Sequence, residues 1–304
     1  MKHWIEAARV RTLPLSVSGI LVGSFYAMSQ AIFNWYIVGF ALLTTLGLQI
    51  LSNFANDYGD GVKGTDNEDR VGPQRAVQSG AISPQSMKSA IRLTAVITFV
   101  FATLLIYFSF KDQYVYYSLF FLVLGVIAIA SAIRYTVGNS AYGYRGWGDV
   151  FVFVFFGWVS TMGTYFLFAK EWDWYLTLPA TAIGLLSVGV LNLNNMRDED
   201  SDRKSGKRTM VVKMGGAAAR QYHYFLITTA MVLMLGFGLL KGFAIDQYIY
   251  VIVFFPLMSH MLRVHRTQNN RELDPELKRL AISTFVLAIL LSLCLIYFIS
   301  DLIV

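Results

Sequence analysis

The sequence predicts an all-α fold, a polytopic membrane bundle of nine transmembrane helices in a single domain over residues 1–304. Composition is the first reason: 56% of the 304 residues are hydrophobic and only 14% are charged. The second reason is that the apolar residues form continuous stretches near the roughly 20 residues that a helix needs to cross a bilayer. Strands are not expected, because an open sheet edge in lipid would leave backbone polar groups unpaired.

Nine apolar stretches succeed one another along the chain, and each is expected to be a spanning helix. Their cores are Leu13–Phe33, Trp35–Phe54, Ala90–Phe110, Tyr114–Ala132, Val150–Phe168, Leu176–Leu193, Tyr224–Leu240, Gln247–Leu262 and Leu280–Val304. The connections after the second and sixth helices are long, roughly 30 residues each, and connections of that length are usually functional or disordered. Glycines at turn-like positions and mixed charge lead us to expect ordered caps there.

The basic residues are distributed unevenly about these helices. Of the 25 Lys and Arg residues, all except Lys111, Lys170 and Lys241 fall in the N-terminal segment or in the connections after even-numbered helices. Basic residues collect on the cytoplasmic side of membrane proteins. The N-terminus and both long loops are therefore expected in the cytoplasm, and the C-terminus on the opposite side. The net charge of +6 is explained by this orientation and by anionic lipid, and no nucleic-acid partner is expected.

An acidic motif, N-F-A-N-D-Y-G-D, ends the second apolar stretch. Asn53, Asp57 and Asp60 are spaced i, i+4 and i+7, so they share one face if the helix continues through them. Asp66 follows in the loop. Mg²⁺ favours carboxylate oxygen and binds phosphates through one or two carboxylates. The alternative is a solvated loop that caps the helix, but acids at a helix C-terminus are unfavourable with the macrodipole.

A second acidic motif, N-N-M-R-D-E-D-S-D, ends the sixth apolar stretch. Asn195, Asp198 and Asp202 again share one helical face. The basic residues that follow could donate hydrogen bonds to diphosphate oxygens: they are Lys204, Lys207 and Arg208. The alternative for each of these cations is a membrane anchor that obeys the positive-inside rule.

The segment 134–149 after the fourth helix is rich in glycine, tyrosine and arginine. Tyr135 and Tyr142 offer ring faces that can stabilise a cation, and Arg145 offers charge. An interfacial aromatic belt explains the rings about equally well. The four histidines have no metal-ligand spacing, so zinc is not expected. No Walker A sequence and no G-x-S-x-G elbow occur, so neither ATP hydrolysis nor that type of acyl transfer is indicated.

Five stretches together carry a resemblance to a known family. They are R-T-L-P-L (11–15), L-Q-I-L-S-N-F-A-N-D-Y-G-D-G-V-K-G-T-D (48–66), Y-T-V-G-N (135–139), V-F-F-G-W (154–158) and N-N-M-R-D-E-D-S-D-R-K-S-G-K-R-T (194–209). In this order, on nine predicted helices, they resemble the UbiA-type intramembrane aromatic prenyltransferases. The match is closer to the branch that prenylates 1,4-dihydroxy-2-naphthoate in menaquinone synthesis. The chain departs from the broader family in the first motif. The family usually has a third acid four residues after the second, whereas this chain has Gly64 at that position and its next acid, Asp66, two residues later.

The resemblance implies an Mg²⁺-dependent enzyme of the bacterial cytoplasmic (inner) membrane. It would transfer a polyprenyl group from an allylic diphosphate to 1,4-dihydroxy-2-naphthoate with loss of CO₂ and diphosphate, giving demethylmenaquinone. Mg²⁺ would be held by Asp57, Asp60, Asp198 and Asp202. Asn53 and Tyr135 would also serve catalysis. Substrate would be bound by Lys63, Asp66, Arg75, Tyr142, Arg145, Asn195, Lys204, Lys207 and Arg208.

Three other functions share some of these features. The same fold could prenylate another acceptor, such as 4-hydroxybenzoate, homogentisate, or a haem or chlorin ring. A CDP-alcohol phosphotransferase needs Asp-Gly followed by Ala-Arg, whereas Asp60-Gly61 is followed by Val62-Lys63. A cation-coupled transporter would place its acids near the bilayer midplane on broken helices, whereas here they lie at helix ends.

Overall fold

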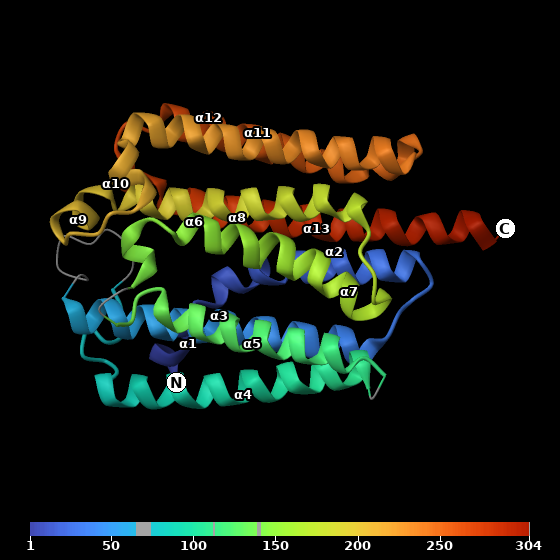
Figure 1. The fold of residues 1–304 in the computed structure, drawn as a ribbon. Coiled ribbons are helices and arrows are strands. Elements are labelled where there is room, and N and C mark those ends of the chain that lie inside the picture. The colour runs from blue at the N-terminus through green and yellow to red at the C-terminus, as the bar shows by residue number, and fades with distance from the viewer. Residues whose placement is uncertain (65–73, 112, 139–140, 304) are drawn as a thin grey trace.

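The computed structural model describes residues 1–64, 74–111, 113–138 and 141–303. Every regular element in these residues is a helix, and the long helices run nearly parallel to one another (Figure 1). Asp66, expected to bind substrate, lies outside the described residues. The prediction of a single domain stays a prediction.

Eight helices in the described residues are long and apolar enough to cross a membrane. They are α3 (Trp35–Lys63), α4 (Pro84–Phe110), α5 (Val115–Arg134), the run of α6 (Gly148–Val152), η3 (Phe153–Gly163) and α7 (Thr164–Ala169), the run of η4 (Trp174–Leu176) and α8 (Thr177–Arg197), α11 (Gly216–Lys241), the run of η5 (Ile245–Val253) and α12 (Phe254–Arg266), and the run of η6 (Asn270–Leu273) and α13 (Asp274–Ile303). A ninth span is formed if α1 (Lys2–Ala8) and α2 (Leu13–Ser29), bent by 51°, count as one. The predicted helical membrane bundle is confirmed.

Four short helical elements lie at the end of the bundle that carries the acidic motifs. They are η1 (Val10–Thr12), η2 (Tyr142–Arg145), α9 (Glu199–Lys204) and α10 (Met210–Met214). The N-cap of α10 is Thr209, which accepts a hydrogen bond from the N–H of Val212 at 3.3 Å and so satisfies one donor of the first turn.

The second predicted spanning helix, α3, extends beyond its apolar core of Trp35–Phe54 as far as Lys63. The side chain of Asn34 caps the start of α3 by accepting a hydrogen bond from the Tyr36 N–H at 2.9 Å. The helix ends at Lys63, because Gly64 follows at φ +68°, a conformation that glycine adopts without steric penalty. The whole first acidic motif therefore lies on helix, as its spacing requires.

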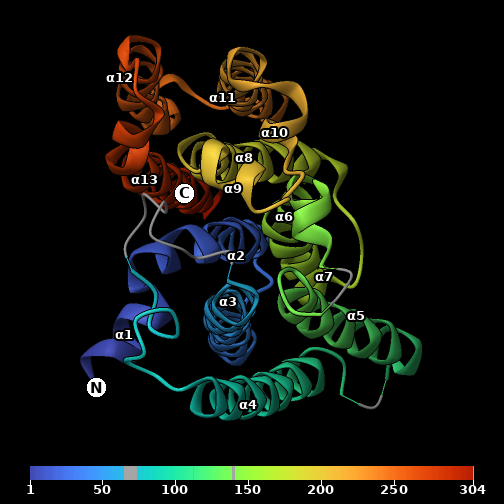
Figure 2. The same ribbon diagram turned by 90° about the vertical axis from the view of Figure 1, so that its left-hand side faces the viewer.

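Figure 2, seen along the helices, shows the bundle as two groups. One contains α3, α4 and α5, the other contains α8, α11, α12 and α13, and α2 lies between them. They are joined where α13 packs on α2 and where η3 packs on both α2 and α8. The last of these contacts is very close: a Cβ on Gly23 would lie 2.3 Å from the carbonyl oxygen of Thr161, and one on Gly184 would lie 3.0 Å from that of Phe153. Only glycine fits at these two crossings.

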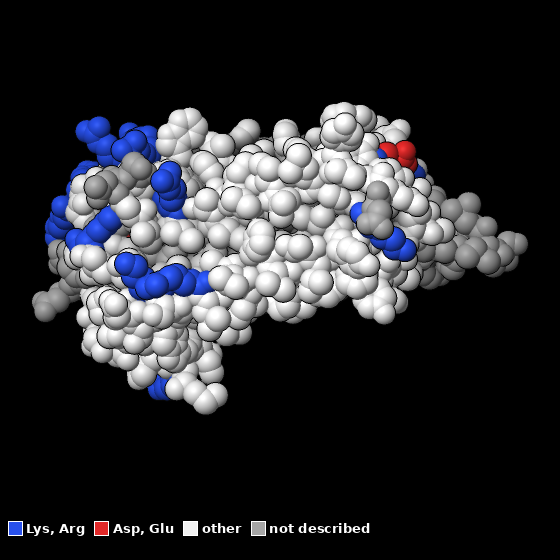
Figure 3. Space-filling view, turned by 60° about the horizontal axis from the view of Figure 1, so that its bottom comes forward, with Lys and Arg blue, Asp and Glu red and all other residues white. Residues whose placement is uncertain are grey.

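On one face of the bundle, the charged side chains of the described residues lie toward its two ends. On the face shown in Figure 3, most Lys and Arg side chains gather at the end that carries α9, and a broad uncharged band separates them from a few at the other end. An uncharged band of this kind is what the hydrocarbon core of a bilayer requires.

Candidate active site

A cavity of about 430 Å³ runs between α2, α3, α4, α5, η3, α8 and α13. At the end of the bundle that carries α9 its lining is charged and polar, and includes Asp60, Arg75, Asn194, Asp198, Asp202 and Lys207. Farther along the bundle its lining is mainly apolar, and includes Ala41, Leu105, Ile106, Phe121 and Leu167. Asp60 and Ala41 both line it and are 19 residues apart on α3, which is about 28 Å along a helix axis. The cavity is therefore a long apolar channel with a charged mouth.

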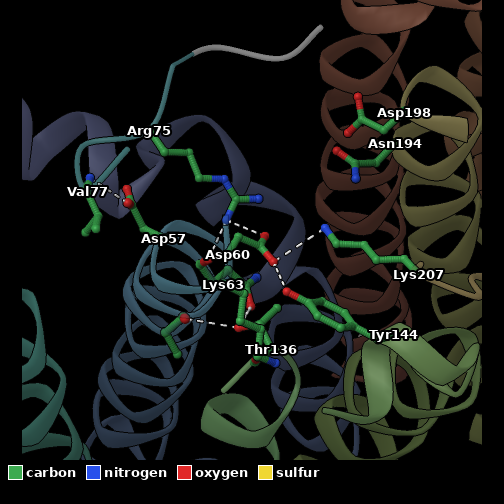
Figure 4. Close-up of polar contacts among 12 residues, drawn as sticks. Asp57, Asp60, Lys63, Arg75, Val77, Thr136, Tyr144, Asn194, Asp198 and Lys207 are labelled. Carbon is green, nitrogen blue, oxygen red and sulfur yellow. Dashed lines mark hydrogen bonds and ion pairs between the residues drawn. The ribbon is translucent and has the colours of Figure 1, made fainter. Parts of the chain in front are cut away.

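Asp60 is the most heavily paired carboxylate at this mouth. Its Oδ2 lies 2.7 Å from Nη1 of Arg75, and its Oδ1 lies 3.4 Å from Nζ of Lys207. The hydroxyl of Tyr144 also donates to Oδ1 (Figure 4). Asp60 is buried, and a buried carboxylate stays ionised only when charge and hydrogen bonds surround it. Arg75, Lys207 and Tyr144 supply them.

Asp57 lies one helical turn before Asp60, and its carboxylate has a different role in this structure. It accepts hydrogen bonds from the backbone N–H groups of Ala76 and Val77, at 3.1 and 2.9 Å. It is not among the residues that line the cavity. Through these two bonds it fixes the chain beside Arg75, so it positions the cation that pairs with Asp60. Whether Asp57 also binds Mg²⁺ stays a prediction.

The second motif lies where α8 ends and α9 begins. Asp198 follows the last residue of α8, and Asp202 is buried in α9. Arg197 holds Asp198 with both ends of its guanidinium, Nε to Oδ1 at 2.8 Å and Nη2 to Oδ2 at 2.6 Å. The same guanidinium pairs with Asp274 at the start of α13 and donates to the amide oxygen of Asn194 at 2.9 Å. Asp198 is thus held rigidly at the junction of three helices.

Lys207 bridges the two motifs. Its Nζ lies 3.4 Å from Oδ1 of Asp60 and 3.5 Å from Oδ1 of Asp202. The ring of Tyr144 lies beneath two ammonium groups, with its centroid 4.9 Å from Nζ of Lys207 and 4.3 Å from Nζ of Lys63. Figure 4 shows Arg75 and Lys207 approaching Asp60 from opposite sides, with Asp198 across the gap. One cation already contacts carboxylates from both motifs.

The other expected residues divide into two groups. Asn53, Asn195, Tyr135 and Tyr142 line the cavity. Burial raises the pKa of both tyrosines, so their phenols stay protonated at neutral pH. Lys63, Arg145, Lys204 and Arg208 are exposed and do not line the cavity. Lys63 donates instead to the carbonyl of Thr136 at 2.7 Å.

Three residues that take part in the site were not among the expected site residues. Tyr144 bonds Asp60, Arg197 clamps Asp198, and Asp274 receives Arg197. Arg197 stands in the quoted N-N-M-R-D motif directly before Asp198, so its proximity was readable from the sequence. The position of Asp274 was not, because it begins the last helix, far along the chain.

The carboxylates fit a hard divalent cation. Asp60, Asp198 and Asp202 line one cavity mouth, and carboxylate oxygens are the ligands that Mg²⁺ prefers. Burial raises the pKa of Asp202 to about 6, and added positive charge would relieve the cost of ionising it. Among the described residues, no three His, Cys, Asp or Glu side chains are grouped closely enough to hold a metal ion by themselves. The carboxylates are paired with Arg75, Lys207 and Arg197 instead, so a metal would have to displace these partners or share their carboxylates.

Comparisons with known proteins identify the fold and the family. Residues 16–289 match the UbiA prenyltransferase family. The chain is 40% identical over 296 residues to a 1,4-dihydroxy-2-naphthoate octaprenyltransferase of Haemophilus influenzae, covering 96% of this chain and 95% of that one. It is 41% identical to the Escherichia coli protein of the same name, with 95% of each chain covered. A UbiA homologue from Archaeoglobus fulgidus, solved with GPP and Mg²⁺, has the same fold, with a TM-score of 0.70 at 12% identity over 98% of this chain and 99% of that one. The chain belongs to the UbiA prenyltransferase family.

Proposed function

We propose that this protein transfers a polyprenyl group from an allylic polyprenyl diphosphate to 1,4-dihydroxy-2-naphthoate. CO₂ and diphosphate are lost, and the product is demethylmenaquinone, released in its hydroquinone form. The observation that carries the proposal is the cavity itself: paired carboxylates and cations stand at the mouth of a long apolar channel. A diphosphate suits the charged mouth and a hydrocarbon tail suits the channel. The naphthoate acceptor is supported by the names of the two relatives near 40% identity.

Mg²⁺ is the proposed cofactor, held by Asp60, Asp198 and Asp202, with Asp57 as the further predicted ligand. When bound, it would neutralise charge on the diphosphate and make that group easier to expel. The relatives solved with Mg²⁺ and a prenyl diphosphate support this assignment for the family.

The residues of this chain have definable tasks in such a reaction. Arg75 and Lys207, freed from Asp60, can pair with diphosphate oxygens and stabilise the charge that develops as the allylic C–O bond breaks. Arg197 keeps Asp198 in place. Tyr135 and Tyr142 present aromatic rings to the cavity, with ring centroids 5.3 Å apart at 85°. Such rings stabilise an allylic cation and exclude water from it until the acceptor ring forms the new C–C bond.

The orientation in the membrane is also a proposal. The end that carries α9 is rich in Lys and Arg (Figure 3), and basic residues collect on the cytoplasmic side. We place the cavity mouth at the inner face of a bacterial cytoplasmic membrane, where water-soluble acceptors and diphosphates are available.

The experiment uses purified protein in detergent with farnesyl diphosphate and separate acceptors, 1,4-dihydroxy-2-naphthoate and 4-hydroxybenzoate. Products are identified by mass spectrometry, with Mg²⁺ or with EDTA, and Asp60→Asn is the matched control. The expected result is a decarboxylated prenyl-naphthohydroquinone that forms only with Mg²⁺ and not with the variant. Prenylation of 4-hydroxybenzoate alone would overturn the acceptor, and full activity in EDTA would overturn the metal.

A further inference from the structure

Two glycines in the apolar part of the cavity have open space in front of them. They are Gly125 on α5 and Gly163 at the end of η3, and both line the cavity. The nearest atom to a Cβ on Gly125 would be the Cβ of Ala102 at 3.8 Å, and to a Cβ on Gly163 it would be Cγ1 of Val159 at 3.8 Å. These are ordinary contact distances, so a larger side chain at either position would extend into the cavity without first striking its neighbours.

Helix packing does not explain these two glycines. At Gly19, Gly23 and Gly157 an added Cβ would lie 1.9 to 2.6 Å from atoms of a neighbouring helix, so those glycines permit close crossings. Gly125 and Gly163 permit no such crossing. Glycine within a helix is less favourable than alanine. What these two positions provide in return is empty volume inside the channel.

The π-helical geometry of η3 keeps Gly163 on the channel wall. Neighbouring residues on this span line the cavity in pairs that recur every four residues: Phe151 and Val152, Phe155 and Phe156, Val159 and Ser160, Gly163 and Thr164, followed by Leu167. In an α-helix of 3.6 residues per turn, each four-residue step turns about 40° past a full turn, so Gly163 would be rotated about 120° away from Phe151. The wider π turn, with its i→i+5 hydrogen bonds, removes this drift over Phe153–Gly163.

The two glycines lie at different depths below the charged mouth. Gly125 is nine residues before Arg134, where α5 ends, or about 14 Å along the helix. Gly163 is 15 residues after Gly148, where its span begins, or up to about 22 Å. An isoprene unit adds four chain bonds of about 1.5 Å, so an extended unit is roughly 5 Å long. Gly125 is thus level with about the third unit of a bound chain, and Gly163 with about the fourth.

We propose that Gly125 and Gly163 determine which prenyl chain lengths the enzyme accepts, by leaving the channel open at two successive levels. The inference rests on the proposed function, since it needs a prenyl diphosphate in the cavity. A bulky side chain at Gly125 closes the channel nearer the mouth, and one at Gly163 closes it deeper. The two substitutions should therefore shorten the accepted chain to different extents, in that order.

The test compares Gly125→Phe and Gly163→Phe with the parent protein. The donors are geranyl, farnesyl and geranylgeranyl diphosphate, and kcat/KM is measured for each. The control is Gly236→Phe on α11, where no atom lies within 4 Å of an added Cβ and which does not line the cavity. Folding is checked by thermal unfolding and gel filtration, and Gly125→Leu and Gly163→Leu replace any phenylalanine variant that does not fold.

For Gly125→Phe we expect kcat/KM to be retained with the geranyl donor and lowered about tenfold or more with the geranylgeranyl donor. For Gly163→Phe we expect kcat/KM to be retained with the farnesyl donor and lowered only with the longer, geranylgeranyl donor. Gly236→Phe should match the parent throughout. Folded variants that keep the parent's preference, or that lose all donors equally, would overturn the inference while the proposed function stands. A parent protein that prenylates no acceptor with any donor would overturn both.

Discussion

Replacing Lys207 by glutamine tests the proposal that the ammonium group of Lys207 occupies a position between the two acidic motifs that Mg²⁺ can take instead. The ammonium lies between Asp60 and Asp202, at 3.4 and 3.5 Å. Lys207→Gln removes its charge and leaves a polar side chain of similar length. We expect three linked effects: a less stable metal-free protein, a larger stabilisation by Mg²⁺, and a lower turnover.

The size of the first effect follows from burial. The side chain of Lys207 is 13% exposed and those of Asp60 and Asp202 are 3% and 9% exposed. Removing one partner of a buried ion pair typically costs 3–5 kcal/mol. Asp60 keeps Arg75 and Tyr144, so we expect the lower end, about 3 kcal/mol. The second effect is opposite in sign, because Mg²⁺ no longer competes with an ammonium. At 100 times its Kd, a ligand that binds only the folded state stabilises it by about 2.7 kcal/mol.

Thermal unfolding in detergent, with and without Mg²⁺, measures the first two effects, and product formation measures the third. Arg203→Gln is the matched control, because Arg203 is an exposed cation on α9, four residues before Lys207, and its pair with Glu199 spans i, i+4. Such exposed pairs contribute only about 0.3–0.5 kcal/mol. A Lys207→Gln protein whose stability without metal equals that of the parent, and whose response to Mg²⁺ is no larger, would refute the reasoning.

Three further predictions concern individual carboxylates. Asp57→Asn and Asp198→Asn should each lower turnover by about 100-fold or more while membrane insertion, measured by fractionation, is unchanged; normal activity of both would reject their assignment. Burial raises the pKa of Asp202 to about 6, so Mg²⁺ affinity, followed by titration, should be constant above pH 7 and fall up to about tenfold per pH unit below pH 6 as this group gains a proton. Because that pKa is raised, ionised Asp202 lowers the stability of the metal-free fold above pH 6, and this loss should disappear toward pH 4 or with saturating Mg²⁺. Glu276→Gln removes a buried charge outside the cavity that pairs with Arg263 and Arg279 and contacts His260; it should lower the melting temperature by several degrees without changing turnover per folded molecule, whereas exposed Glu272→Gln should change neither.

Much of the fold could be predicted because lipid imposes simple rules on the sequence. Continuous apolar stretches had to be helices, and this prediction is confirmed. The orientation expected from the uneven basic residues stays a prediction. What periodicity could not predict was local geometry. The π turns of η3 pack closely against α2 and α8 at Gly23 and Gly184, and no propensity scale reports such contacts.

The acidic residues of the site were predictable for a related reason. Carboxylates in an apolar chain are rare, so their spacing at Asp57, Asp60, Asp198 and Asp202 stood out. Their partners were harder to identify. Arginines and lysines are abundant at the same end of the bundle, and the sequence cannot distinguish an exposed cation such as Arg208 from a buried one such as Arg197, which holds Asp198. Only the folded arrangement separates them.

The charges that line the cavity suggest why metal and diphosphate should bind together. Among the residues that the structure describes, its acidic lining residues are Asp60, Asp198, Asp202 and Asp274 and its basic ones are Arg9, Arg75, Lys207 and Lys278, so the two signs are equal in number there. Mg²⁺ alone must compete with the lysine and arginine side chains that already pair with the carboxylates. Diphosphate alone is repelled by those carboxylates, because both are negatively charged. When both arrive, the carboxylates can exchange a lysine or arginine for the metal, while the released cations pair with phosphate oxygens. Because such coupling is reciprocal, each ligand should raise the affinity for the other by the same factor, and Lys207, which faces both motifs, is the residue through which most of that exchange would pass.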